Sequence, residues 1–127
     1  MNILITGGAG YIGSVLVDYI LSQPWVLNSS PFSSGVPDVN IRVIDNLMYK
    51  QDGLIPFCSL KYGDKFDFVF GDVRDESLLK KHVEWADVII PLAAIVGMPA
   101  CERDKMGALN INKDHVCWLA VHKQQDA

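Results

Sequence analysis

The sequence predicts an α/β fold: a partial doubly wound parallel sheet of about four strands, in the order 3-2-1-4. Short apolar segments alternate with segments of helical period, and glycine or polar residues separate them. In addition, the first apolar segment runs directly into a cluster of glycines. Strands that alternate with helices form parallel sheets through right-handed crossovers. The 127 residues, half of them hydrophobic, are enough for one domain with its own core.

The first half of the chain supplies three of the expected strands. Residues 2–6 (NILIT) are a short apolar run cut off by glycine, which predicts a buried strand. From Tyr11 to about Leu21, apolar residues recur with a helical period and predict a helix. Residues 22–40 are rich in Ser, Pro and Asn, which is typical of a loop. Two further apolar runs, at residues 41–45 and 66–70, predict the second and third strands.

The second half of the chain supplies the fourth strand and two helices. Residues 76–85 (ESLLKKHVEW) predict an amphipathic helix with its charges outside. The run ADVIIPLAA at residues 86–94 predicts a strand that is buried on both faces. From about residue 106 to 122 the pattern predicts a last helix. Its expected inner stripe is Leu109, Val116, Leu119 and Ala120.

The composition excludes several classes of function. Eleven Lys and Arg against fifteen Asp and Glu give a formal net charge of -4, whereas nucleic-acid-binding proteins present a basic stripe. No apolar run approaches the roughly 20 residues that a membrane span needs. The three cysteines, Cys58, Cys101 and Cys117, stand far apart, which argues against a zinc site or a disulfide framework and favours a reducing compartment. We therefore expect a cytoplasmic protein without a metal site that binds neither nucleic acid nor membranes.

The glycine cluster indicates an anion-binding turn. Gly8, Gly10 and Gly13 satisfy G-x-G-x-x-G, and Gly7, Gly10 and Gly13 satisfy the wider G-x-x-G-x-x-G spacing. The cluster lies between a predicted strand and a predicted helix, the context in which such a loop binds a pyrophosphate at the helix amino terminus. A purely structural turn is the alternative. A nucleoside triphosphate loop is excluded, because Ser14 and not Lys follows the last glycine.

An acidic residue at the end of the second strand indicates which dinucleotide is bound. Asp45 stands at that point, where a carboxylate accepts hydrogen bonds from a ribose diol and repels a 2′-phosphate. It therefore favours NAD over NADP, although a solvated strand-end aspartate is the alternative. An S-adenosylmethionine-dependent methyltransferase would also have a glycine loop, but such proteins usually have an acid at the end of the first strand, where Thr6 stands.

Four motifs in order resemble the extended short-chain dehydrogenase/reductase family, the NAD-dependent nucleotide-sugar epimerases and dehydratases with a Rossmann-type fold. They are TGGAGYIGS, DNL, GDVRD and LAA, and the resemblance covers nearly the whole chain outside residues 23–40. The resemblance implies the following cofactor-binding residues: Gly7, Gly10, Tyr11, Ile12 and Gly13 at the pyrophosphate; Asp45, Asn46 and Leu47 at the adenosine ribose; Asp72 and Val73 at the adenine; Leu92, Ala93 and Ala94 at the nicotinamide-side ribose; and Asn110 in the following helix. Asp72 has an alternative interpretation as the cap of the next helix.

The chain departs from the family pattern at several positions. Pro91 stands where the family often has histidine, and Lys113 and Asp114 stand where a small residue and threonine are usual. His115 is a tempting catalytic histidine, but without a partner in a motif we interpret it as partly buried or exposed filler. Family members also use a Tyr-x-x-x-Lys pair, in which the lysine lowers the tyrosine pKa so that tyrosine acts as a base. None of the four tyrosines is followed by lysine at that spacing, so we expect no catalytic residues and no turnover in this chain alone.

These observations give two hypotheses of function. In the first, residues 1–127 are the truncated dinucleotide-binding domain of a nucleotide-sugar epimerase or dehydratase whose substrate domain is absent. In the second, the chain is a stand-alone, non-catalytic dinucleotide-binding or assembly module. We expect the isolated chain to form a homo-oligomer, because the fourth strand would be an apolar, nearly uncharged sheet edge of a kind that natural proteins usually cover, whereas a stable monomer would favour the second hypothesis.

Overall fold

The computed structural model describes residues 1–27, 38–51 and 54–125. Four parallel strands form one sheet in the order β3-β2-β1-β4, so the predicted strand order is confirmed. The strands are β1 (Asn2–Thr6), β2 (Asn40–Asp45), β3 (Phe66–Phe70) and β4 (Val88–Pro91). Ile3 pairs with Ile41 on one side and with Val88 on the other, which fixes the register of β1 against β2 and β4. All four carboxyl ends therefore lie at one edge of the sheet.

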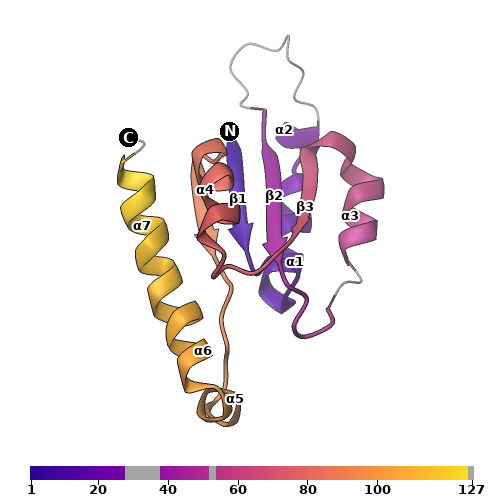
Figure 1. Cartoon of the computed structure of the whole chain (residues 1–127). Helices are drawn as coiled ribbons and strands as arrows, with labels where there is room; N and C mark the ends of the chain where they lie inside the picture. The colour runs from indigo at the N-terminus through magenta and orange to yellow at the C-terminus, as the bar shows by residue number, and fades with distance from the viewer. Residues whose placement is uncertain (28–37, 52–53, 126–127) are drawn as a thin grey trace.

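Helices cover both faces of the sheet, as a doubly wound fold requires (Figure 1). On one face, α1 (Tyr11–Leu21) and α3 (Leu54–Tyr62) bury Val17, Leu21 and Tyr62 against Ile3, Ile5 and the neighbouring strand. On the other face, α4 (Glu76–Trp85) and α7 (His115–Gln125) pack on Leu4 and Ile44. Successive side chains of a strand point to opposite faces, so β1 contributes to both cores.

The connections differ in part from the expected loops. A short helical turn, α2 (Pro24–Leu27), begins the predicted loop at residues 22–40, while residues 28–37 of that loop lie outside the described residues. The crossover from β2 to β3 contains α3 and a 3-10 turn, η1 (Gly63–Lys65), for which the sequence analysis assigns no element. After β4 the chain continues through α5 (Met98–Arg103). Within the described ranges, no helix is long and apolar enough to cross a membrane.

The last helical segment contains a π turn that changes which side chains face the core. It consists of α6 (Lys105–Leu109), the π turn η2 (Asn110–Asp114) and α7. Because a π turn contains more residues than an α turn, it rotates the residues that follow it around the helix axis. The residues that face inward are therefore spaced by four: Gly107, Ile111, His115 and Leu119. The predicted stripe is wrong except at Leu119, because Leu109, Val116 and Ala120 are exposed.

Candidate functional site

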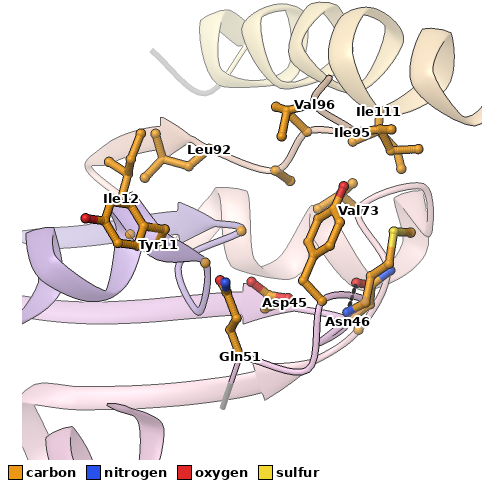
Figure 2. Close-up of a pocket in the computed structure, with 18 residues that line it drawn as sticks. Tyr11, Ile12, Asp45, Asn46, Gln51, Val73, Leu92, Ile95, Val96 and Ile111 are labelled. Carbon is orange, nitrogen blue, oxygen red and sulfur yellow. Dashed lines mark hydrogen bonds between the residues drawn. The ribbon is translucent and has the colours of Figure 1, made fainter. Parts of the chain in front are cut away.

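A cavity of about 340 Å³ lies at the carboxyl ends of the strands, beside the glycine turn. Figure 2 shows Tyr11 and Ile12 on one side of it and Asn46 and Val73 on another. Ligands of open α/β sheets bind at this edge, where the strand order reverses between β1 and β4. The cavity brings together eleven of the fourteen residues that the sequence analysis predicts for cofactor binding: Gly7, Gly10, Tyr11, Ile12, Gly13, Asp45, Asn46, Val73, Leu92, Ala93 and Ala94. The other three, Leu47, Asp72 and Asn110, do not line it.

Gly7 and Gly13 are required by the fold itself. Gly7 has φ +74°, and a Cβ there would lie 2.5 Å from the backbone nitrogen of Ala93. A Cβ on Gly13 would lie 2.5 Å from the Cα of Gly8. The first glycine therefore lets the turn pass close to the chain after β4, and the second lets α1 begin against the turn. A side chain at either position would force the backbone apart.

Gly10 is different, because the backbone does not require glycine there. Its φ of -69° and ψ of -178° are accessible to any residue. The nearest heavy atom to a Cβ on Gly10 would be the carbonyl oxygen of Gly7, at 3.3 Å. Gly10 is the N-cap of α1, and no side chain caps the helix or adds an acidic charge in its first turn. The amino terminus of α1 thus presents free N–H donors and a partial positive charge to the cavity.

Asp45 joins the glycine turn to the loop after β2. One carboxylate oxygen accepts a hydrogen bond from the backbone N–H of Ala9 at 3.0 Å, and the other accepts from Leu47 at 2.8 Å. The neighbouring Asn46 accepts from the N–H of Met48 at 3.0 Å. Leu47 has φ +55°, so the chain turns sharply at this residue. Asp45 and Asn46 therefore build the loop as well as line the cavity.

Asp72 lies outside the cavity lining and forms an ion pair instead. Arg74 donates from Nε to one oxygen of Asp72 at 2.9 Å and from Nη2 to the other at 2.6 Å. These hydrogen bonds to Arg74 lower the pKa of Asp72 to about 2, so the carboxylate stays ionised. The alternative interpretation of Asp72 as a helix cap is wrong, because Asp75 caps α4 by accepting from the N–H of Leu78 at 3.1 Å.

The chain after β4 is held by an asparagine that the sequence analysis does not single out. Asn112, in the π turn, accepts from the N–H of Ile95 and donates to its carbonyl, both at 2.8 Å. The thiol of Cys101 donates to the same carbonyl at 3.3 Å. The sequence offers Asn110 and Asn112 two residues apart, and only the π turn decides that Asn112 reaches Ile95. Ile111, between them, lines the cavity.

His115 is a buried residue, not the partly buried or exposed one that the sequence predicts. It is 3% exposed, and its Nε2 lies 3.1 Å from the hydroxyl of Thr6, which is fully buried at the end of β1. Burial lowers the pKa of His115, so the ring is neutral inside the fold. Its Nδ1 has no hydrogen-bond partner within the described part of the chain. His115 does not line the cavity.

The cavity also includes residues that the sequence analysis does not predict. Met48, Tyr49 and Gln51 come from the loop after β2, and Gly71 follows β3. Ile95, Val96 and Ile111 form the wall near the C-terminal helices. The only sequence signal for Met48, Tyr49 and Gln51 was their position directly after the DNL motif. Across the described ranges, no three His, Cys, Asp or Glu side chains gather into a possible metal site.

Comparison with known proteins identifies relatives of this arrangement. The model of the NAD dependent epimerase/dehydratase family matches residues 3–119. An uncharacterised membrane protein of Methanocaldococcus jannaschii is 30% identical over 111 residues, which are 87% of this chain and 28% of the relative. A dTDP-glucose 4,6-dehydratase of Streptomyces niveus is 36% identical over 96 residues, 74% of this chain and 25% of the relative.

Solved structures share the fold over nearly the whole chain. A dTDP-glucose 4,6-dehydratase from Streptomyces venezuelae, crystallised with NAD bound, superposes with a TM-score of 0.76 and 25% identity, covering 99% of this chain and 36% of that one. The chain thus spans about a quarter of the curated relatives and about a third of the solved structure. On the family match over residues 3–119, the chain belongs to the NAD-dependent epimerase/dehydratase family.

Proposed function

We propose that this chain is the NAD-binding portion of an NAD-dependent nucleotide-sugar epimerase or dehydratase. One observation carries the proposal: the uncapped amino terminus of α1 opens into a cavity that also contains Asp45. Its N-cap is Gly10, whose backbone angles do not require glycine. A helix amino terminus attracts phosphate, and a carboxylate at the end of the second strand suits a ribose diol. The two dTDP-glucose 4,6-dehydratases named above support the same assignment.

In this proposal the backbone of α1 holds the pyrophosphate and Asp45 holds the adenosine ribose. The N–H groups of Tyr11 and Ile12 donate to phosphate oxygens, which approach closely because Gly10 has no side chain. Each oxygen of Asp45 already accepts one backbone N–H. Because a carboxylate oxygen has a second acceptor site, each can also accept from a ribose hydroxyl. The negative charge of Asp45 would repel the 2′-phosphate of NADP.

The residues after β4 hold the nicotinamide half of the cofactor. Ala93 and Ala94 have small side chains that let a ribose pass close to the backbone. Asn112 keeps this segment in place through its two hydrogen bonds to Ile95. A nicotinamide held there would supply reversible hydride transfer with a sugar carbon. Since no Tyr-x-x-x-Lys pair is present in the 127 residues, we expect this chain to bind and orient the cofactor without turnover.

A second candidate function is a stand-alone dinucleotide-binding or assembly module. The observation that favours it is that a single cavity of this chain already brings together the glycine turn, Asp45 and the segment after β4. Both candidates require NAD binding. They differ in what else each requires. Only the first needs catalytic residues and a nucleotide-sugar site from elsewhere in a complete enzyme.

Calorimetric titration of the purified chain with NAD, ADP-ribose and NADP tests the proposal. We expect NAD and ADP-ribose to bind, and NADP to bind at least tenfold more weakly, since about 1.4 kcal/mol of charge repulsion suffices for that factor. A parallel assay with UDP-glucose should show no epimerisation above background. Absence of NAD binding, or equal affinity for NADP, would contradict the cofactor assignment, and turnover after stringent purification would show that a base is present.

A further inference from the structure

The loop after β2 forms a tight turn that contributes residues to the cavity. Its backbone turns twice through the left-handed region, at Leu47 with φ +55° and at Lys50 with φ +56°. The N–H of Lys50 donates to the carbonyl of Leu47 at 2.9 Å and closes a tight turn. Met48 and Tyr49 occupy the corner of this turn, and both line the cavity. Residues other than glycine seldom adopt this conformation, so surrounding contacts must hold the loop in place.

Those contacts are visible in the structure. Asp45 and Asn46 accept hydrogen bonds from the N–H groups of Leu47 and Met48, at 2.8 and 3.0 Å. The same two side chains line the cavity. The carboxylate expected to hold the ribose therefore also orients the loop that carries Tyr49. The adenine ring attached to that ribose would extend beyond Asp45, toward the carboxyl ends of β2 and β3.

The cavity wall contributed by the elements after β3 and β4 is apolar and fixed. Val73, Ile95 and Ile111 are 8%, 5% and 5% exposed and form one buried cluster. All three line the cavity, and Figure 2 shows Ile95 and Ile111 on the side of the cavity nearest the C-terminal helices. A wall of this kind can contact the face of a flat ring without moving.

Tyr49 is the aromatic residue of the β2 loop that borders this space. It is 51% exposed although it lines the cavity, and its ring stacks on no other ring in the described part of the chain. An exposed aromatic ring beside an apolar wall, next to a ribose-binding carboxylate, has the chemistry of a stacking surface for a purine. Stacking of a base on an aromatic side chain contributes about 1–3 kcal/mol.

We propose that Tyr49 is a stacking platform for the adenine ring of the cofactor, with Val73 contributing to the apolar wall of the same site. The inference rests on the proposed function and adds the residue that recognises the base. In this proposal the faces of the Tyr49 ring provide the affinity for adenine, and the phenolic hydroxyl of Tyr49 provides none of it. Other planar purine nucleotides would bind the same platform, whereas the nicotinamide half of NAD would not touch it.

Titrations of the whole chain with NAD, AMP and nicotinamide mononucleotide test this inference. Tyr49→Ala should weaken NAD and AMP by the same factor, about tenfold for roughly 1.4 kcal/mol of lost stacking. Affinity for nicotinamide mononucleotide should stay within twofold, and Tyr49→Phe should match the unchanged protein with all ligands. Tyr19→Ala is the matched control, because Tyr19 is 65% exposed on α1 and does not line the cavity.

Tyr49→Trp keeps the inference testable if the alanine variant does not fold. Its fluorescence should be quenched by AMP and not by nicotinamide mononucleotide, after subtraction of the signal from the same titration of the unchanged chain. The inference is wrong if a folded Tyr49→Ala binds AMP normally, if Tyr49→Phe loses as much affinity as Tyr49→Ala, or if the tryptophan signal ignores AMP. If the unchanged chain binds neither NAD nor AMP, the proposed function fails first, which distinguishes the two failures.

Discussion

Substitution of Gly10 by alanine should separate cofactor binding from folding. Gly10 has ordinary backbone angles, and an added Cβ would meet only the carbonyl oxygen of Gly7 at 3.3 Å and the side-chain oxygen of Gln51 at 4.0 Å. The same methyl group would project into the cavity beside the first N–H groups of α1. Gly7→Ala is the matched contrast, because its Cβ would lie 2.5 Å from the Ala93 backbone.

The expected magnitudes follow from these contacts. For Gly10→Ala, the lower entropy of the unfolded chain stabilises by about 0.4–1 kcal/mol and loss of a good N-cap residue costs a similar amount, so net stability should change by less than about 1 kcal/mol. Displacing the pyrophosphate from two N–H donors removes two hydrogen bonds to a charged group. At about 1.5 kcal/mol each, the loss is about 3 kcal/mol, or roughly a hundredfold in affinity.

For Gly7→Ala the effect should fall on folding. The left-handed conformation costs an alanine about 1–2 kcal/mol, and relief of the backbone clash adds to that cost. Urea unfolding measures stability of both variants, and calorimetry with NAD measures binding. A folded Gly10→Ala that binds NAD with unchanged affinity would refute the phosphate-loop interpretation. A Gly7→Ala as stable as the unchanged chain would refute the steric argument for that turn.

Four further predictions concern other parts of the molecule. Asp45→Asn should weaken NAD binding about tenfold and reduce the preference over NADP, as calorimetry would detect. Asn112→Ala should cost about 1–3 kcal/mol in urea unfolding, because it leaves the polar groups of the segment after β4 unpaired; unchanged stability would contradict this. Burial lowers the pKa of both His82 and His115 from the usual 6.5, so the folded chain binds fewer protons than the unfolded chain. The two neutral histidines therefore contribute fully to stability above pH 6.5, and this contribution is lost as the pH falls through 6.5 toward their pKa values in the folded chain. A urea midpoint that does not change from pH 8 to pH 5 would contradict this prediction. The uncharged strand β4 pairs only with β1 within the described residues, so light scattering should show self-association at micromolar concentration, and a stable monomer would count against it.

The sequence by itself determined the strand order and most of the cavity. Periodicity of apolar residues is a local property, so the strands and the long helices could be predicted from it. The glycine positions carry partly local information, because the φ of +74° at Gly7 and the contact of Gly13 with Gly8 arise within the turn, whereas the close approach of Gly7 to Ala93 is a tertiary contact. Asp45 was predictable since parallel strands end at one edge of the sheet, which puts a residue at the end of β2 beside the turn that follows β1.

Tertiary structure alone decided the assignments that depend on the direction of a side chain. The π turn rotated the last helix, and so placed His115 beside Thr6 and made Asn112 reach Ile95. An α-helical period of 3.6 predicts neither, since an i→i+5 turn leaves no composition signal in these residues. Asp72, by contrast, forms a local ion pair with Arg74, two residues away, and does not line the cavity. The position of Tyr49 depends on two left-handed residues and on the hydrogen bonds that Asp45 and Asn46 accept from the N–H groups of Leu47 and Met48, so it is set only once the whole loop has formed.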